Sequence, residues 1–427
     1  MNIWLMNHYA TDMFINKAGR HYWFAKDLKK RGNEVTVFCA NTFLNSHNVI
    51  NVGKKYFLEL IDEETGTPFV FIKTRSSIGN GIDRILNMVL FYKNLIPIAI
   101  HRGKFIKHPD VIVASSVHPL TMVAGIRISK KLGVPCICEI RDLWPEAIFA
   151  FGRAKENSLI GKMLIRGEHW IYRNADALIF TKEGDTDYLR ERGWTVDQGG
   201  DIDIRKCHYI NNGVDLEGYI KQIEDNVLKD DDLYDNMFNV VYTGTIRPVN
   251  NIGNLLDTAK IIKEKGYQNI KFLIYGDGME RQKLEKRIIE EEIKNVVFKG
   301  SVERKYIPYI LSKSSLNLLN YSQAKYNWSR GNSSNKLFEY MASGKPIIST
   351  VQMGYSIINK YKCGIELKED TPECLAQAII NFYNMKEEEY TEYSENAKKG
   401  VQDFDFNVLT EKLIHVIDEV LNRSQDY

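Results

Sequence analysis

Residues 335–346 read NKLFEYMASGKP, and this stretch determines how the second half of the chain is interpreted. A serine or asparagine within 333–335 can cap the start of a helix, because its side chain accepts a hydrogen bond from a first-turn backbone N–H. Gly344 and Pro346 then end the helix and lead into a strand. A helix that passes directly into a strand in this way is the repeating step of an α/β sheet.

Two charged side chains on this predicted helix form a candidate anion site. Lys336 lies in the first turn, where backbone amides and the helix dipole favour negative charge, so it can pair with a diphosphate. Glu339 lies one turn later on the same face and can accept two hydroxyl hydrogen bonds from a ribose. The alternative is an ordinary capped helix with a solvated Lys/Glu pair, and spacing alone does not separate the two interpretations.

An alternation of strands and helices runs through the rest of the chain. In the second half, strands are predicted at 238–243, 270–275, 295–299, 316–319 and 346–349, and helices at 251–265, 279–291 and 336–342. In the first half, strands are predicted at 2–6, 34–39, 111–115, 135–140 and 177–181, and helices at 19–31 and 121–132. This order predicts parallel sheets with helices on both faces.

A domain boundary is expected where the chain passes through Asn211, Asn212 and Gly213 into a polar, acidic stretch that reaches Asp235. A long terminal helix is predicted at 406–423. The fold class is therefore α/β, with two doubly wound, Rossmann-like parallel-sheet domains. Such domains bind ligands at the carboxyl ends of their strands, so we expect them to face a central cleft.

Composition narrows the class of protein. The 427 residues carry a formal net charge of +2, which argues against wholesale nucleic-acid binding. The six cysteines are scattered and form no metal pattern; Cys136 and Cys138 alternate on a predicted strand and should point to one face. The N-terminus does not resemble a signal peptide, and no apolar run is long enough to span a membrane. A cytoplasmic protein is expected, with contact to the inner face of the plasma membrane left open.

Taken together, the motifs resemble the retaining GT-B glycosyltransferases of family 4. The resemblance is closest to the fucosamine-transferase-like branch of bacterial O-antigen and capsule (lipopolysaccharide) biosynthesis. It rests, besides 335–346, on GRHYWFAKDLKKRG at 19–32, EIRDLWPE at 139–146, INNGVD at 210–215, YTGTI at 242–246 and IYGDG at 274–278. It implies an acceptor-binding domain over 1–210, with 406–427 packing back on it, and a nucleotide-sugar-binding domain over 211–405.

The resemblance also implies functional residues. The donor nucleotide-sugar site would comprise Gly19, Gly244, Arg247, Gly276, Val302, Asn335, Lys336 and Glu339. The catalytic group would comprise Asp142, His118 and Glu339. Bland alternatives stay open: Gly19 as a turn glycine, Asp142 as an ion-pair partner of Arg141 or Arg153, and His118 as a structural histidine.

Three positions depart from the family pattern. Thr245 and Asn250 stand where many members have an arginine and a lysine that grip the diphosphate, so Arg247 and Lys336 are the expected substitutes. Gly331 stands where many members have a glutamate that contacts the donor sugar. A deoxy or N-acetylated sugar is therefore as plausible a donor group as glucose.

The implied reaction is attack of an acceptor hydroxyl on the anomeric carbon of a nucleoside-diphosphate sugar, expected to be UDP-linked, with retention of configuration. Cations and helix amides can stabilise the diphosphate leaving group, so we expect no metal and no cofactor beyond the nucleotide-sugar co-substrate. Asp201 and Asp203 have the spacing of a metal-binding pair but precede the boundary in a loop.

The expected acceptor is a saccharide or a polyprenyl-diphosphate-linked saccharide. Residues 84–107 combine apolar side chains with basic ones and contain no acidic residue, so they suit an anionic membrane surface. A core-packing helix with a few surface cations explains the same segment equally well.

Competing functions remain. A UDP-sugar 2-epimerase on the same fold also cleaves the bond between sugar and diphosphate. A non-catalytic, transferase-like subunit would explain the missing arginine, lysine and glutamate. A dinucleotide-dependent oxidoreductase is least favoured, because Gly276 and Gly278 lack the third glycine of the dinucleotide fingerprint.

Overall fold

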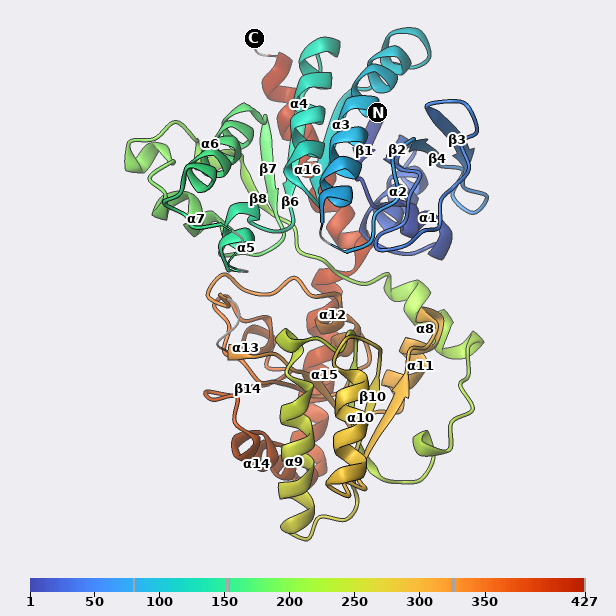
Figure 1. The fold of residues 1–427 in the computed structure, drawn as a ribbon, viewed down its shortest axis with the longest axis vertical. Helices are drawn as coiled ribbons and strands as arrows, with labels where there is room; N and C mark the ends of the chain where they lie inside the picture. Colours follow the sequence, from blue (N-terminus) through green and yellow to red (C-terminus); the bar gives the residue numbers. More distant parts are fainter. Residues whose placement is uncertain (80, 151, 153, 324–326, 426–427) are drawn as a thin grey trace. The chain divides into compact units, whose positions relative to one another are not determined.

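The computed structural model of the chain describes residues 1–79, 81–150, 152, 154–323 and 327–425 (Figure 1). It divides into two compact units. The first comprises Met1–Asn211 together with Phe406–Tyr427, and the second comprises Asn212–Asp405. The division falls between the two asparagines at which the sequence predicted a boundary.

The first unit is built on an eight-stranded sheet of order β3-β4-β2-β1-β5-β6-β7-β8. Its strands are β1 (Asn2–Met6), β2 (Glu34–Ala40), β3 (Phe57–Ile61), β4 (Pro68–Ile72), β5 (Val111–Ser116), β6 (Cys136–Ile140), β7 (Ala177–Phe180) and β8 (Cys207–Tyr209). Only the edge strand β3 is antiparallel, pairing with β4 from Phe57 opposite Ile72 to Ile61 opposite Pro68.

Helices cover both faces of this sheet (Figure 1). They are α1 (Thr11–Asn16), α2 (Arg20–Lys30), α3 (Ile82–Phe105), α4 (Pro119–Leu132), α5 (Trp144–Ala150), α6 (Leu159–Asn174), α7 (Asp185–Glu191) and the terminal α16 (Phe406–Gln425). Alternate residues of β1 enter different cores, because successive side chains of a strand point to opposite faces. Trp4 and Met6 join the cluster beneath α3 and α4, whereas Ile3 and Leu5 join the one beneath α2 and α16.

The second unit has a six-stranded parallel sheet of order β11-β10-β9-β12-β13-β14. Its strands are β9 (Phe238–Thr243), β10 (Ile270–Tyr275), β11 (Val296–Gly300), β12 (Leu316–Leu319), β13 (Ile347–Ser349) and β14 (Gly364–Glu366). Its helices are α8 (Leu216–Asp225), α9 (Ile252–Glu264), α10 (Arg281–Glu290), α11 (Ile307–Ser312), α12 (Asn335–Ala342), α13 (Ile357–Tyr361), α14 (Pro372–Tyr383) and α15 (Glu387–Val401). The predicted fold class, two doubly wound α/β domains, is confirmed.

The structure corrects one local expectation and adds an unpredicted element. Ser334 precedes α12 at the N-cap position, but its side chain makes no capping hydrogen bond. The β3–β4 hairpin was not predicted, because β3 is a mostly exposed edge strand whose burial pattern does not alternate. Cys136 and Cys138 both enter the cluster beneath α4, as predicted for alternate residues of a strand. In the described part of the chain, no helix is long and apolar enough to cross a membrane.

Candidate active site

Two glycine turns lie side by side at the carboxyl ends of β9 and β10. Gly244 follows β9 and donates its backbone N–H to the Tyr275 carbonyl at 2.9 Å. Gly276 follows β10 with φ 149°, and a Cβ atom added there would lie 1.8 Å from the Gly244 carbonyl oxygen. Only glycine fits a contact this close between two backbones. The two turns lie at the carboxyl ends of the strands, where α/β folds bind their ligands, and their glycines leave space there.

Lys336 lies against the first of these turns. A Cβ atom on Gly244 would come within 3.1 Å of Lys336 Cδ, so the absent side chain leaves room for the lysine. The Lys336 ammonium donates a hydrogen bond to the Tyr242 hydroxyl at 3.3 Å. It also lies 4.6 Å from the ring centroid of Tyr242 and 4.9 Å from that of Tyr321. Two aromatic faces therefore hold the cation by cation–π attraction.

The electrostatics of Lys336 are unusual for a lysine. Burial lowers its pKa to about 7, with a further lowering by the guanidinium of exposed Arg247 and a smaller opposing effect from Glu339. Glu339 is partly neutralised elsewhere, because its Oε1 accepts a hydrogen bond from Arg304 at 3.1 Å. The carboxyl end of β9 thus carries two cations near one another. An anion bound there would relieve their repulsion and favour the charged form of Lys336.

The remaining predicted donor residues take distinct positions in the second unit. Val302 is half-buried in the turn that follows β11, and Asn335 is exposed as the first residue of α12. Glu339 is one turn further along α12, and its side chain is 17% exposed. The structure therefore brings together Gly244, Gly276 and Lys336 most closely.

The three departures from the family pattern have structural explanations. Thr245 is exposed and carries no charge; its carbonyl accepts a hydrogen bond from the Tyr242 hydroxyl at 2.8 Å. Asn250 is buried, and its carbonyl accepts from the Asn320 amide at 2.7 Å, so this position faces the interior. Gly331 has φ 97°, a conformation that a glutamate would adopt only with strain. Arg247 and Lys336, the expected substitutes, lie near one another at the carboxyl end of β9.

In the first unit, the buried carboxylate of Glu139 in β6 organises the corresponding edge of the sheet. Its Oε1 accepts a hydrogen bond from Arg20 Nε at 2.7 Å, and its Oε2 accepts from the Ser115 hydroxyl at 2.6 Å. His21 Nε2 lies 3.0 Å from the same Oε2. Arg20 also donates to the carbonyls of Ile210 and Asn211, at 2.9 and 2.5 Å. The carboxylate therefore connects β5, β6 and the start of α2, and Arg20 extends the network to residues 210 and 211.

The charge of Glu139 is well compensated. Burial alone would raise its pKa, but Arg20, His21 and the Ser115 hydrogen bond outweigh burial and hold the pKa well below the usual range. Burial lowers the pKa of His21, against the opposing effect of the carboxylate. Glu139 is thus an ionised structural anchor rather than a proton donor near neutral pH.

Gly19 immediately precedes this network. It is the N-cap residue of α2 with φ 113°, and an added Cβ atom would lie 2.9 Å from Met13 Cγ. Glycine is therefore required for the backbone conformation, whatever else binds there.

The two predicted catalytic residues of the first unit differ sharply in exposure. Asp142 is exposed just beyond β6 and makes no side-chain hydrogen bond or ion pair with any residue that the structure describes. Arg153, one of its alternative partners, lies outside the described residues. His118 is 1% exposed and pairs through Nε2 with Nδ1 of His8 at 2.7 Å. Burial lowers the pKa of His118 to about 3, so it is neutral at physiological pH.

Sequence reasoning did not assign roles to several residues that shape these sites. Tyr242 and Tyr321 contact Lys336, and Arg304 contacts Glu339. An aromatic residue in or next to a buried strand is expected to be part of the core, so the sequence does not indicate that these two tyrosines contact a functional residue. Glu139 had a detectable signal, because a carboxylate inside the buried strand CICEI must find a partner.

Comparisons with known proteins agree with this architecture. Residues 22–217 match the model of "Glycosyltransferase Family 4", and residues 224–400 match that of "Glycosyl transferases group 1". No curated protein matches the sequence. The fold is shared with sucrose-phosphate synthase from Thermosynechococcus elongatus, with a TM-score of 0.68 and 15% identity over 99% of this chain and 100% of that one.

Two further solved structures share the fold. HepE of Anabaena, in complex with UDP, aligns with a TM-score of 0.66 and 14% identity over 98% of this chain and 100% of that one. The α,α-trehalose 6-phosphate synthase of Burkholderia multivorans aligns with a TM-score of 0.71 and 11% identity over 99% of each chain. At such identities the likeness shows the fold alone.

The two doubly wound α/β units, the second with glycine turns after β9 and β10, define the class as GT-B proteins. Because one family model matches within each half, the chain is a nucleotide-sugar glycosyltransferase of family 4, group 1. The predicted family is thereby confirmed at this level.

The Glu139 network predicts a large loss of stability on substitution. Glu139→Gln keeps the side-chain shape but leaves Arg20 buried without its counter-charge, so the free energy of unfolding of the first unit should fall by about 3–5 kcal/mol. Ser115→Ala removes one hydrogen bond to the same carboxylate and should cost about 1–3 kcal/mol. Urea unfolding at pH 7 measures both. A Glu139→Gln protein as stable as the wild type would show that the pair contributes nothing.

Proposed function

We propose that this chain transfers a sugar from a UDP-linked donor to a lipid-linked saccharide acceptor, with retention of configuration and without a metal. The observation that carries the donor assignment is the enclosure of Lys336 between two tyrosine rings, with Arg247 nearby. A lysine with a pKa near 7 beside another cation is poorly stabilised alone and gains from an anionic ligand. The diphosphate of a nucleotide sugar is such a ligand.

The proposed chemistry follows from these charges. The acceptor oxygen forms a bond to the anomeric carbon and gives up its proton to the Asp142 carboxylate, while the bond from that carbon to the diphosphate oxygen breaks. The electron pair leaves on the diphosphate, where Lys336, Arg247 and the first-turn amides of α12 stabilise it. Arg304 orients the carboxylate of Glu339. This carboxylate accepts hydrogen bonds from the ribose hydroxyls. Glycine turns at Gly244 and Gly276 leave room for the phosphates.

In the first unit, Asp142 is the candidate that orients or deprotonates the acceptor hydroxyl. Its exposure at the end of β6 leaves the carboxylate accessible to a substrate. His118 is buried against His8, so we assign it a positioning role rather than a proton-transfer role. HepE, the Anabaena protein with the same fold, was solved with UDP, which supports a uridine nucleotide here.

The pathway part of the proposal rests on the resemblance to the fucosamine-transferase-like branch. Synthesis of a bacterial O-antigen or capsule would place the acceptor on a polyprenyl diphosphate at the membrane. The competing 2-epimerase needs no acceptor, and a non-catalytic subunit would form no product at all.

Product analysis tests the transferase against its competitors. The protein is incubated with radiolabelled UDP-sugars, with and without a bacterial lipid extract, and the products are separated. We expect UDP and a labelled lipid only when the extract is present. Formation of free sugar or its 2-epimer without an acceptor would identify an epimerase instead.

The same assay tests Asp142. Asp142→Asn should reduce transfer by about 10²–10⁴-fold while leaving the nucleotide affinity intact, because general-base catalysis contributes a factor of this size. Glu156→Gln, a substitution of another exposed acid of the first unit, serves as the control. A fully active Asp142→Asn variant would remove Asp142 from the reaction.

The low pKa of Lys336 predicts a pH dependence of nucleotide binding. Lys336 is charged below about pH 7 in the free protein, and a diphosphate favours the charged form. Above pH 7 binding must therefore take up a proton, so the affinity for UDP should fall as the pH rises from 6.5 to 8.5. Lys336→Ala should weaken binding at pH 6.5 by about 1–3 kcal/mol and abolish this pH dependence.

Calorimetry without added metal measures this effect, with Lys283→Ala, an exposed lysine of α10, as the control. If the wild-type affinity did not change with pH, or if Lys336→Ala kept the same slope, Lys336 would not contact the diphosphate.

A further inference from the structure

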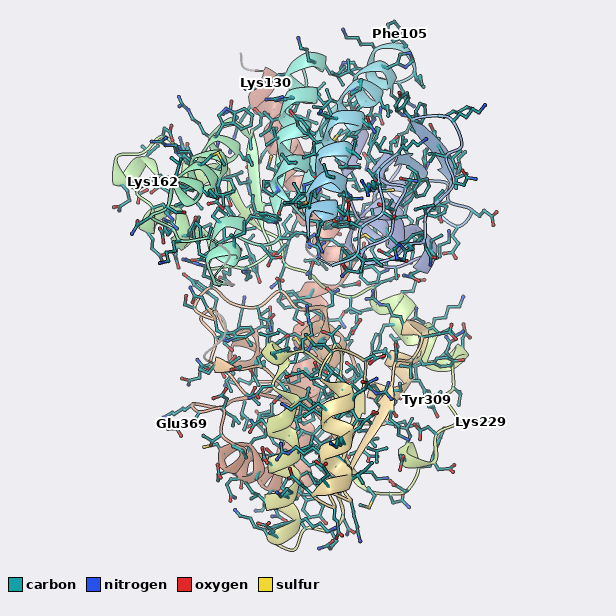
Figure 2. The ribbon with its side chains drawn as sticks, in the orientation of Figure 1. Phe105, Lys130, Lys162, Lys229, Tyr309 and Glu369 are labelled. Carbon is teal, nitrogen blue, oxygen red and sulfur yellow. The ribbon has the colours of Figure 1, made fainter. Side chains whose placement is uncertain are left out.

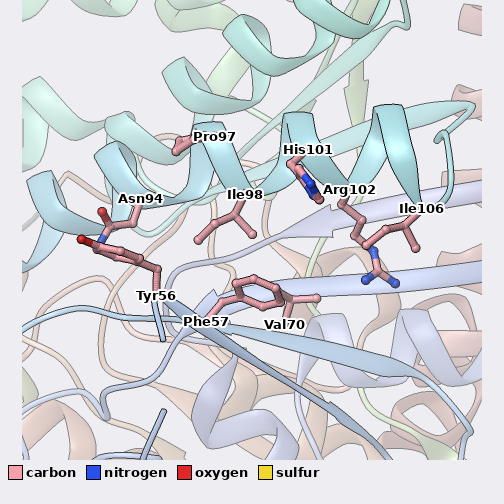
Figure 3. A pocket seen from close by; sticks show the side chains of 9 residues that line it. All are labelled: Tyr56, Phe57, Val70, Asn94, Pro97, Ile98, His101, Arg102 and Ile106. Carbon is pink, nitrogen blue, oxygen red and sulfur yellow. The ribbon is translucent and has the colours of Figure 1, made fainter. Parts of the chain in front are cut away.

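A cavity of about 480 Å³ lies in the first unit between α3 and the β3–β4 hairpin, and neither Gly19 nor Asp142 lines it. Figure 3 shows Ile98 directed from α3 toward Phe57 and Val70 of the hairpin. The side chains that line it are Tyr56, Phe57, Val70, Asn94, Pro97, Ile98, His101, Arg102 and Ile106. Almost all of the lining surface is apolar, which suits a hydrocarbon better than a sugar or a nucleotide.

Apolar side chains continue from the cavity to the surface of the unit. Tyr56 is 68% exposed and Ile106 is 61% exposed, and both also line the cavity. Phe105, at the end of α3, is 74% exposed (Figure 2). The buried face of α3 is already used, because Phe91, Leu95 and Ala99 pack in the core. The exposed apolar residues are therefore not needed to hold the helix in place.

Exposed lysines lie next in sequence to residues that line the cavity. Lys54 and Lys55 precede Tyr56, and Lys93 precedes Asn94; all three lysines are exposed. Glu59 of β3 accepts a hydrogen bond at 3.2 Å from Arg102, which lines the cavity from α3. No acidic residue occurs between Asp83 and Asp110. An apolar cavity flanked by cations complements a hydrocarbon chain that carries an anionic head group.

We infer that this cavity binds a single hydrocarbon chain of an anionic lipid, the anchor of the acceptor. Its volume of about 480 Å³ is large enough for a segment of a hydrocarbon chain. The inference rests on the proposed lipid-linked acceptor and adds where its chain is held. It also accounts for both features of 84–107. One face of α3 packs in the core, and another lines the cavity next to surface cations.

Farnesyl phosphate, which joins a fifteen-carbon chain to an anionic group, is a direct probe. Titrated below its micellar concentration, it should bind the full-length protein, whereas inorganic phosphate should not. Ile98→Trp fills the cavity and should weaken binding about tenfold or more, because the apolar burial is lost. Ile85→Trp places the same residue on an exposed part of α3 and should change the affinity by less than about twofold.

A second variant tests the charges without filling the cavity. Lys54→Glu combined with Lys55→Glu should weaken binding of farnesyl phosphate several-fold and leave binding of uncharged farnesol unchanged.

Absence of farnesyl phosphate binding, equal binding of inorganic phosphate, or equal affinity of the Ile98→Trp and Ile85→Trp proteins would overturn the inference. Each variant is also titrated with UDP. If the wild type binds UDP but not the lipid, the cavity assignment alone is refuted. If the wild type does not bind UDP, the proposed function is refuted.

Discussion

The buried ion pair of Glu139 and Arg20 is the interaction on which the first unit depends. A carboxylate inside a sheet is tolerated only when its charge and its lone pairs are satisfied, and here Arg20, Ser115 and His21 do this together. Because Arg20 also holds the carbonyls of Ile210 and Asn211, the pair fixes the start of α2 relative to the end of the unit. Gly19 directly precedes Arg20 and Asp142 follows Glu139 by three residues, so both candidate functional residues lie close in sequence to this pair.

The charge of Lys336 in the second unit, unlike that of Glu139, is not neutralised by an ion pair with a described residue. Lys336 has aromatic faces and one hydroxyl for partners, with Arg247 close by and Glu339 engaged by Arg304. Glu139 is stabilised by its own neighbours, whereas Lys336 makes no ion pair with any residue that the structure describes, and Glu339 only partly offsets the effect of burial on its pKa. A structural charge is compensated within the fold, and a binding charge is compensated by its ligand. This contrast is the physical basis for assigning the donor to the second unit.

Much of the fold could be predicted because its parallel strands are buried on both faces and read as short apolar runs. β9, β10 and β12 were predicted with the bounds that the structure gives, whereas the exposed β3 was missed. Residues placed by local geometry, such as Gly244 and Gly276, could be found from turns that follow strands. The rings of Tyr242 and Tyr321 could not, because they meet Lys336 from strands and loops distant in sequence.

The cap of α12 and the burial of His118 show the same limit. Both depend on which neighbour reaches a side chain, and residue type alone does not specify that neighbour. The pairing of His118 with His8 joins residues far apart in the chain. Long-range contacts of this kind decide whether a polar residue lines a site or supports it from beneath.

The central claim, a nucleotide-diphosphate site at the start of α12, is tested most directly by calorimetric titration with a panel of nucleoside diphosphates without added metal. The account predicts that UDP binds selectively, with a dissociation constant of about 1 μM, equivalent to a binding free energy of about −8 kcal/mol. Glu339→Ala should weaken this binding at least about tenfold through loss of the ribose contacts, whereas Glu373→Ala, a change in another helix of the same unit, should not. Absence of binding to any nucleotide, or full affinity in Glu339→Ala, would contradict the account.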